Sequence, residues 1–373
     1  MKFSDVIGNR QAVARLRDMI DADRLPHALL LHGAPGVPKL ALARAATQYL
    51  HCTNRTPQGE PCGQCPSCRQ HQSFNHTDTT FSFPYLKKDD ASTCADYLPQ
   101  WREFLTEHPV EDYEAWLSIL KNDNSQPRIF VKESEAILNR MTLSAYVSKY
   151  KVLIMWLPEK LRDDAANKLL KLIEEPYDDC KFILVSDDAQ AILPTIFSRT
   201  QRLELTRPTL DEVAAVLETT AGIDRRDALA LAATADGNVT AALHLLDAKG
   251  ENVEFHDRFV TLMRQAYLRD LPGLKAWSES VADFKREKAC RFLAYAARQV
   301  RENFVYNLHM PDLNYLTAQE EQFSTRFAPF INAGNVEQLL TLFNEATRDI
   351  RGNASARIVL FDMAVHTTIL IKK

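Results

Sequence analysis

The chain has 373 residues, of which 46% are hydrophobic and 25% are charged, and its formal net charge is −4 at pH 7. This length suits two or three domains of an ordinary globular protein. The acidic balance argues against a protein that coats nucleic acid through bulk positive charge. No apolar run approaches the roughly 20 residues that span a membrane, and the first residues lack the apolar core of a signal peptide. We therefore expect a cytoplasmic protein without a membrane partner, whose thiols stay reduced.

The first 85 residues predict a strand between two helices, followed by a cysteine-rich loop and a second strand. Apolar residues recur at helical spacing within residues 9–22, and the short apolar run 27–32 is a candidate for a buried strand. Residues 41–51 continue as a helix candidate. The cysteine-rich loop occupies about residues 51–72, and residues 78–83 are a second strand candidate.

Residues 86–127 are charged and aromatic, and we interpret them as a partly helical insertion. The insertion is either a partner surface or a segment packed on its own domain, and its two tryptophans favour packing. After it, strand and helix candidates alternate; the strands are 128–131, 151–157, 181–186 and 201–205, and the main helices are 132–147 and 162–175. Continuous apolar strands that alternate with helices predict a parallel sheet covered on both faces. Beyond residue 208 only helical patterns remain.

The sequence GAPGVPKL, which begins at Gly33, lies between the first strand candidate and its helix. This is the layout of a phosphate-binding loop of the pattern G-x-x-x-x-G-K-[ST]. Gly33 and Lys39 fit that pattern, but Pro38 replaces its second glycine and Leu40 replaces the hydroxyl residue. Pro38 has no N–H for a phosphate and Leu40 cannot bind Mg²⁺. We therefore expect a vestigial phosphate loop of Gly33, Gly36 and Lys39, in which the lysine is a solvated residue at a helix start.

Four cysteines follow the spacing C-x9-C-x2-C-x2-C; they are Cys52, Cys62, Cys65 and Cys68. Four thiolates at this density can close a tetrahedron around Zn²⁺. Disulfides are the alternative, but a cytosolic setting disfavours them. Three nearby histidines are rival ligands, namely His51, His71 and His76. Because four cysteines already satisfy the ion and leave no position for a substrate, we expect a structural zinc site.

Three stretches together resemble one family. Residues 3–33 are similar to the start of AAA+ clamp-loader subunits, and residues 150–176 to their Walker B strand and the following helix. The sequence ILPTIFSRTQRLEL, residues 192–205, resembles the segment that carries their Ser-Arg-Cys signature. The resemblance covers roughly residues 3–84 and 128–245. Within the bacterial DNA polymerase III clamp loader it is to subunits of the delta-prime type, whose gamma/tau sibling keeps an intact phosphate loop.

The resemblance implies an α/β fold in three parts. An AAA+, RecA-like domain with a parallel sheet would occupy residues 1–207, with a zinc module inserted at about 51–72 and the further insertion at about 86–127. A small helical lid would follow at 208–248. An all-helical collar for oligomerisation would occupy residues 249–373.

The resemblance also implies which residues of an ATPase site are missing. An acidic pair normally ends the Walker B strand, but Trp156 and Leu157 stand at those positions and Glu159 comes two residues late. Arg199 matches the arginine that acts on ATP bound by a neighbouring subunit, although Thr200 departs from the Ser-Arg-Cys signature. A guanidinium in that position stabilises transition-state charge in trans.

These observations predict a subunit that does not hydrolyse ATP itself but serves DNA replication within the DNA polymerase III holoenzyme. It would assemble with gamma/tau and delta subunits, use Arg199 on a neighbour, and help load the sliding clamp on primed DNA. It would be cytoplasmic and associate with the nucleoid when on DNA. One alternative is an active ATPase of the gamma/tau type. Another is a zinc-containing nucleic-acid-binding module, which the acidic net charge disfavours.

Overall fold

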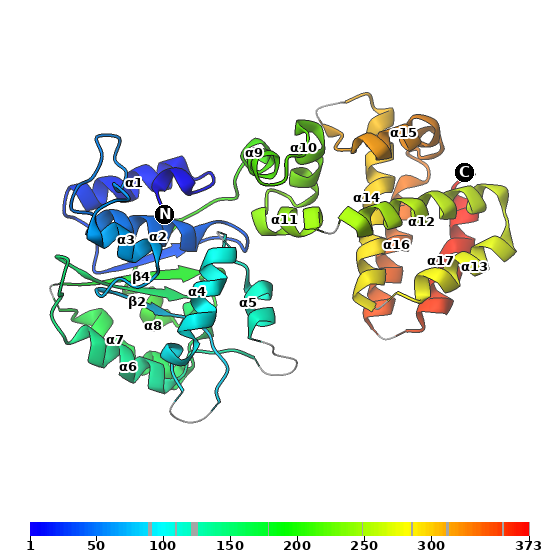
Figure 1. The fold of residues 1–373 in the computed structure, drawn as a ribbon. Helices are drawn as coiled ribbons and strands as arrows, with labels where there is room; N and C mark the ends of the chain where they lie inside the picture. The colour runs from blue at the N-terminus through cyan, green and yellow to red at the C-terminus, as the bar shows by residue number, and fades with distance from the viewer. Residues whose placement is uncertain are drawn as a thin grey trace. The chain divides into compact units, whose positions relative to one another are not determined.

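The computed structural model describes residues 1–88, 92–108, 110–120, 126–177, 179–247, 249–284, 286–310, 313–352 and 354–372. The chain forms two compact units (Figure 1). The first unit contains Met1–Val216 and Gly237–Ala241, and the second contains Leu217–Asp236 and Ala242–Lys373. The division between the units runs through the region in which we expected a lid, and the three-domain boundaries stay a prediction.

The first unit is built on a five-stranded sheet with the strand order β2-β3-β4-β1-β5. The strands are β1 (Ala28–His32), β2 (Thr79–Ser82), β3 (Lys151–Trp156), β4 (Cys180–Ser186) and β5 (Gln201–Glu204). All neighbouring strands are parallel. The central strands β1, β3 and β4 are buried along nearly their whole length, as a parallel sheet covered on both faces requires. The predicted fold class is confirmed.

Helices cover both faces of this sheet (Figure 1). They are α1 (Arg10–Asp21), α2 (Lys39–His51), α3 (Pro66–Gln72), α4 (Leu98–Glu107), α5 (Tyr113–Ile119), α6 (Val131–Met141), α7 (Asp163–Glu174) and α8 (Pro194–Phe197). Successive side chains of a strand point to opposite faces. Leu29 and Leu31 accordingly join an apolar cluster with α1, α2 and α4, whereas Leu30 joins a second cluster with α6 and α7.

The region after the insertion differs from the sequence-based expectation. Residues 128–131 do not form a strand: Arg128 and Ile129 make only isolated bridges, and α6 begins at Val131. The predicted helix 132–147 also ends early, at Met141. The physical reason is an acceptor outside the helix, because the Asp78 carboxylate takes the N–H groups of the three residues from 146 to 148.

The second unit is helical. Its helices are α10 (Arg225–Thr234), α12 (Lys249–Leu268), α13 (Leu271–Ala282), α14 (Arg286–Asn307), α15 (Ala318–Phe327), α16 (Val336–Arg351) and α17 (Ala356–Leu370). Two further helices contain residues of both units, namely α9 (Leu210–Ala221) and α11 (Val239–Asp247). In α16, Leu339 and Phe343 are fully buried in the core of the unit. The apolar face of this helix therefore packs within its own domain.

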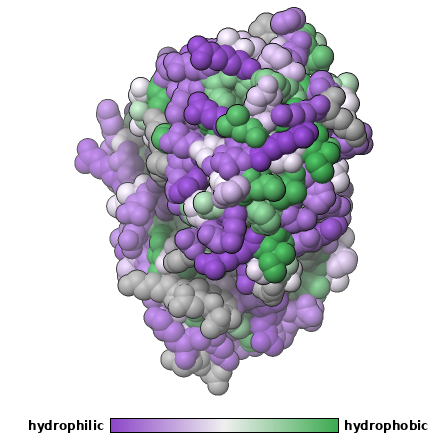
Figure 2. Space-filling model, turned by 90° about the vertical axis from the view of Figure 1, so that its right-hand side faces the viewer, coloured by the Kyte–Doolittle hydropathy of each residue, from purple (hydrophilic) through white to green (hydrophobic). Residues whose placement is uncertain are grey.

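Apolar side chains also reach the surface of the second unit, notably Leu268, Leu271, Ile358 and Ile369. Figure 2 shows hydrophobic residues grouped between hydrophilic ones on the face that it draws. Across the described part of the chain, no helix combines the length and the apolar character that crossing a membrane requires.

Asp78 supplies the first testable prediction. Its carboxylate accepts the N–H groups of Tyr146, Val147 and Ser148 at 2.7, 2.7 and 2.8 Å. Burial acts to raise the pKa of Asp78, but these three bonds together hold it below its usual 3.8. We expect Asp78→Asn to lower the free energy of unfolding at pH 7 by about 2 kcal/mol, measured by urea unfolding.

The pH dependence follows from the sign of that shift. A carboxyl whose pKa is lower in the folded state stabilises the protein above its unfolded pKa and loses this effect as pH falls through the folded pKa. The difference between wild type and Asp78→Asn should therefore shrink below about pH 4. Asp18→Asn, at an exposed position of α1, is the matched control. An equal effect of the two substitutions at pH 7 would contradict the assignment.

Candidate functional site

The loop between β1 and α2 lies where the strands of the sheet end. In a parallel sheet the carboxyl ends of the strands share one edge, which is where α/β proteins bind ligands. The end of β3 at Trp156 and the end of β4 at Ser186 lie at the same edge as Gly33. The structure thus places the loop that begins at Gly33 and the end of β3 at the same edge of the sheet.

Lys39 is buried and is held within the protein. Its side chain is fully inaccessible, and its ammonium group donates to the Ala34 carbonyl at 2.7 Å and contacts the Asp187 carboxylate at 2.8 Å. Asp187 directly follows β4, which is why it reaches the loop. The expectation of a solvated lysine is wrong, because the ammonium group has protein partners that replace water.

The first turn of α2 also has an internal partner. The backbone N–H groups of Lys39 and Leu40 both donate to Oε1 of Glu111, at 2.7 and 2.9 Å. Glu111 lies in the insertion, between α4 and α5, and is buried. Burial raises the pKa of this carboxyl, while the Lys39 charge and the Leu40 N–H act in the opposite direction. Sequence reasoning missed this contact, because nothing in a single glutamate marks a partner 71 residues away.

The two glycines of the loop are required by their surroundings. Gly36 has a φ of +77°, and a Cβ there would lie 1.9 Å from Oδ1 of Asn238. A Cβ on Gly33 would lie 2.3 Å from the Leu205 carbonyl oxygen. Asn238 donates to the Pro35 carbonyl at 3.3 Å and accepts from the Ala241 N–H. One side chain therefore both caps α11 and contacts the loop. The glycines therefore serve close packing in this chain.

The end of β3 carries no acidic side chain. Trp156 is fully buried and its ring lies 5.4 Å from that of Trp101 and 5.3 Å from that of Phe104, both in α4. Leu157 is buried and adopts a left-handed φ of 57°. Aromatic rings from the insertion thus fill the space beside the positions where an ATPase of this fold would hold Mg²⁺.

Glu159, the nearest carboxylate, lies beyond the strand as expected. Its Oε1 accepts the N–H of Asp187 at 2.9 Å and that of Asp188 at 3.3 Å. Burial raises the pKa of the Glu159 carboxyl, and its hydrogen bonds act against that shift. The side chain therefore shapes the loop that carries Asp187, the partner of Lys39.

Arg199 lies between α8 and β5, away from the phosphate loop of its own chain. About a third of its side chain is exposed, and it forms an ion pair with Glu174 of α7. Its guanidinium also donates to the Thr195 carbonyl at 2.8 Å. Exposed ion pairs contribute little stability, so the guanidinium can exchange this partner at low cost. The neighbouring Thr200 is nearly buried and bonds to the Phe197 carbonyl, which holds the turn.

The four cysteines converge. Their Sγ atoms all lie within 4.8 Å of one another, and those of Cys62 and Cys68 are 3.9 Å apart. A tetrahedron with Zn–S bonds near 2.3 Å has sulfur–sulfur edges of about 3.8 Å. Backbone N–H groups point at the sulfurs; Cys62 N–H lies 3.3 Å from Sγ of Cys52, and Cys65 N–H lies 3.3 Å from Sγ of Cys62. The donor set fits a closed tetrahedral Zn²⁺ site.

The three histidines form a separate group. His51, His71 and His76 bring their ring nitrogens within 4.8 Å of one another, but the rings are stacked, with His71 and His76 inclined by only 19°. An imidazole lone pair lies in its ring plane, so nearly parallel rings do not converge on one ion. Burial lowers the pKa of His51 to about 3 and that of His71 to about 2, which disfavours their charged forms.

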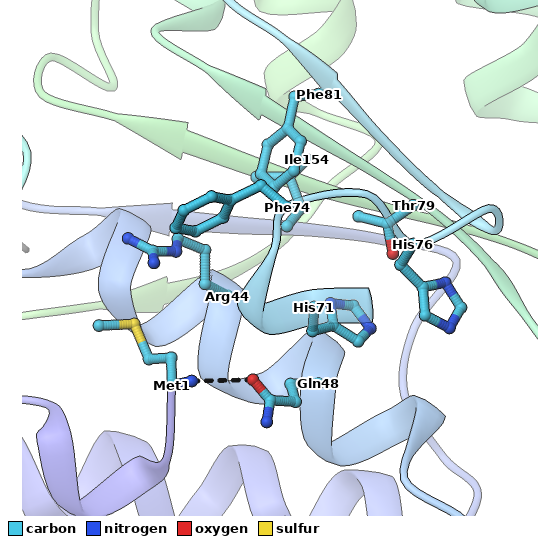
Figure 3. Close-up of a pocket in the computed structure, with 9 residues that line it drawn as sticks. All are labelled: Met1, Arg44, Gln48, His71, Phe74, His76, Thr79, Phe81 and Ile154. Carbon is cyan, nitrogen blue, oxygen red and sulfur yellow. Dashed lines mark hydrogen bonds between the residues drawn. The ribbon is translucent and has the colours of Figure 1, made fainter. Parts of the chain in front are cut away.

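Figure 3 shows a small pocket beside this histidine stack. His71 and His76 line it, and the amino group of Met1 donates to Oε1 of Gln48 at 2.8 Å. Arg44 lies on the same pocket with its guanidinium over the Phe74 ring, and burial lowers the pKa of that guanidinium to about 10. None of the residues predicted for the phosphate loop lines this pocket.

Comparison with known proteins gives a consistent picture. The sequence model of the protein family described as DNA polymerase III, delta subunit, matches residues 8–209. The chain is 26% identical to the DNA polymerase III subunit tau/gamma of Haemophilus influenzae over 266 residues, which are 69% of this chain and 32% of that protein. It is 28% identical to the DNA polymerase III subunit delta' of Bacillus subtilis over 188 residues, which are 50% of this chain and 44% of that protein.

The chain thus spans less than half the length of these curated relatives. Among solved structures, a DNA polymerase III gamma subunit-related protein from Thermotoga maritima aligns with 96% of this chain and 99% of its own, at a TM-score of 0.41 and 10% identity. The Bacillus subtilis DNA clamp loader delta protein aligns with 97% of this chain and all of its own, at a TM-score of 0.32 and 9% identity.

The cysteine geometry generates a prediction about metal content. Protein purified without a polyhistidine tag should contain one zinc per chain, measured by inductively coupled plasma mass spectrometry. The double substitution Cys62→Ser and Cys65→Ser should remove the zinc and lower the melting temperature, because the loop loses the ion that holds its turns together.

Cys290→Ser is the control, because Cys290 is buried in the helical second unit, outside the cluster. This variant should keep its zinc. The assignment would be refuted by wild-type protein without zinc, or by a Cys62→Ser and Cys65→Ser variant that still holds one ion per chain.

Proposed function

Because this chain belongs to the family described as DNA polymerase III, delta subunit, we propose that it is a clamp-loader subunit of the delta-prime type that does not hydrolyse ATP. The observation that carries this proposal is the internal occupancy of the phosphate loop. Lys39 contacts Asp187 within the protein, and the first N–H groups of α2 donate to Glu111. A group already held in this way is not available to a triphosphate.

The end of β3 supports the same proposal. Phosphoryl transfer depends on Mg²⁺ and on positioned charge, and Mg²⁺ requires oxygen ligands. Trp156 and Leu157 offer none, and Glu159 is engaged by the N–H groups of the loop after β4. Loss of the hydroxyl at Leu40 removes one more oxygen. The positions at which an ATPase of this fold would hold the metal, Leu40, Trp156 and Leu157, therefore offer it no side-chain oxygen.

The alternative is an active ATPase of the gamma/tau type. Its support is that several similar proteins carry that name, including those of Haemophilus influenzae and Escherichia coli. A protein named delta' is similar to a comparable degree. The residues at the phosphate loop and at the end of β3 favour the delta-prime type over this alternative.

In the assembled loader, Arg199 would act on ATP held by a neighbouring gamma/tau subunit. The exposure of its guanidinium and its weak partner Glu174 suit a group that changes partner on assembly. Delta and gamma/tau subunits would be its partners, and residues 249–373 would form its part of the collar. The complex would act on the sliding clamp and primed DNA during replication, in the cytoplasm at the nucleoid. The zinc module would have a structural role.

The purified chain alone should therefore not turn over ATP. We expect no hydrolysis above background with Mg²⁺ and ATP, measured by release of inorganic phosphate, because Leu40, Trp156 and Leu157 offer the metal no oxygen. Lys39→Ala should leave this background unchanged. Turnover at the rate of a motor protein, abolished by Lys39→Ala, would establish the gamma/tau alternative instead.

Arg199→Ala tests the role in trans. Reconstitution with gamma/tau and delta chains should give the same hetero-oligomer with this variant as with wild type, measured by native mass spectrometry. Hydrolysis at the adjacent ATP site should fall on the order of 10³-fold, because an arginine finger no longer stabilises the transition state. Single-turnover measurements with the assembled complex give this rate.

Arg202→Ala is the matched control, since Arg202 is an exposed arginine three residues further along, in β5. It should assemble and hydrolyse ATP as wild type does. Normal hydrolysis in an assembled Arg199→Ala complex would remove Arg199 from the mechanism.

A further inference from the structure

The start of α2 has a hydrogen-bonding requirement that its own sequence does not meet. The first N–H groups of any helix lack partners within the helix, and a side-chain oxygen at the N-cap position usually accepts one of them. In α2 the N-cap residue is Pro38, which makes no side-chain cap. The amides of Lys39 and Leu40 are buried; the Lys39 N–H donates to the Val37 carbonyl at 2.7 Å as well, whereas the Leu40 N–H needs an acceptor from elsewhere in the protein.

Glu111 meets this requirement with a carboxylate. One oxygen atom, Oε1, accepts from both Lys39 N–H and Leu40 N–H, at 2.7 and 2.9 Å. An anion held by successive N–H groups at the start of a helix is the arrangement by which phosphate loops bind phosphate. The other oxygen, Oε2, is buried and has no hydrogen-bond partner among the described residues. The Oε1 atom of Glu111 thus lies where a phosphate oxygen would accept the same two N–H groups.

The positive charge of the loop is satisfied at the same place. Lys39, which would reach the terminal phosphates in a working loop, contacts Asp187 instead. The Lys39 charge also acts on Glu111. The buried ammonium group is therefore paired with a carboxylate of the chain, and no anion from solution is needed to neutralise it.

The insertion that carries Glu111 is packed firmly on the domain. Val110 and Asp112, on either side of Glu111, are both buried, and Asp112 caps α5 by accepting the Glu114 N–H at 3.0 Å. In α5, Trp116 is fully buried and donates from its indole nitrogen to the Pro84 carbonyl at 2.7 Å. Withdrawing Glu111 would require this packing to open.

We propose that the insertion is a built-in plug of the vestigial nucleotide site, in which the Glu111 carboxylate replaces a phosphate group on the first N–H groups of α2. The plug excludes phosphate-containing anions as a class, whether they are free phosphates or nucleotides. It rests on the proposed function in one respect, that the loop descends from a phosphate-binding site.

Glu111→Ala in the full-length chain is the direct test, with inorganic pyrophosphate and ATP as probes. Wild type should give no saturable binding of either anion at millimolar concentration, measured by isothermal titration calorimetry. The variant should bind pyrophosphate at least tenfold more tightly than wild type, because it removes the carboxylate that lies against the N–H groups of Lys39 and Leu40. Glu114→Ala, which removes an exposed glutamate from α5, should behave as wild type.

Two results of this titration would overturn the proposal. One is wild-type protein that binds pyrophosphate as tightly as Glu111→Ala does. The other is a Glu111→Ala variant that is folded, as judged by circular dichroism and cooperative melting, but still binds no pyrophosphate.

A second measurement does not depend on a cavity-forming variant. Glu111→Gln keeps the shape and one acceptor oxygen but removes the charge. In nitrogen-15 correlated spectra of the full chain, the amide protons of Lys39 and Leu40 should move to higher field in this variant, because hydrogen bonds to a carboxylate are stronger than those to an amide. The amide of Ala45, later in α2, should stay in place. Unchanged Lys39 and Leu40 resonances would overturn the proposal even if Glu111→Ala does not fold.

These outcomes are separate from those that test the proposed function. The titrations and spectra use the isolated chain and do not involve assembly or Arg199. A wild-type chain that binds pyrophosphate but does not hydrolyse ATP would refute the plug and leave the proposed function intact. Hydrolysis of ATP by the wild-type chain would refute the proposed function.

Discussion

The N-terminus of α2 is the constraint on which the arrangement of the site depends. Buried N–H groups at a helix start require an acceptor, and a buried lysine requires a counter-charge. In this chain Glu111 supplies the first and Asp187 supplies the second, so the loop after β1 is complete without a ligand. The same groups in an open loop would instead attract a phosphate from solution. Under the proposed function, burial of these partners would turn a former phosphate-binding loop into a purely structural connection.

The aromatic cluster around Trp156 packs the insertion against the end of β3. Trp101 and Trp116 of the insertion are buried and lie edge to face, with ring centres 5.3 Å apart. Large aromatic side chains bury roughly 150–250 Å² of surface each and dominate the energy of such contacts. A tryptophan at the end of β3 therefore removes a metal-binding position and at the same time anchors the segment that carries Glu111. Under the proposed function, the loss of a metal ligand and the firm packing of the insertion would have one structural cause.

The groups through which this chain would act on others lie elsewhere. Arg199 is partly exposed and its charge is paired with Glu174 at the surface, whereas Lys39 has no access to solvent. The cysteine cluster holds a loop between α2 and α3, and the second unit has its own helical core. An arginine that is accessible on a domain whose own nucleotide loop is closed matches a subunit that assists its neighbours. The apolar residues on the surface of the second unit are available for the contacts of a collar.

The sequence by itself determined the parallel α/β fold, since continuous apolar runs at β1, β3 and β4 have no other stable use in a chain of this pattern. It also determined the convergence of the cysteines, because their short spacing fixes their distance. Where long-range contacts decide, it failed: Lys39 was expected in solvent and is buried against Asp187, and residues 128–131 were expected as a strand. Only the tertiary structure placed Glu111 on α2. A carboxylate that meets two amides across 71 residues is chosen by the fold of the insertion, and no local pattern encodes it.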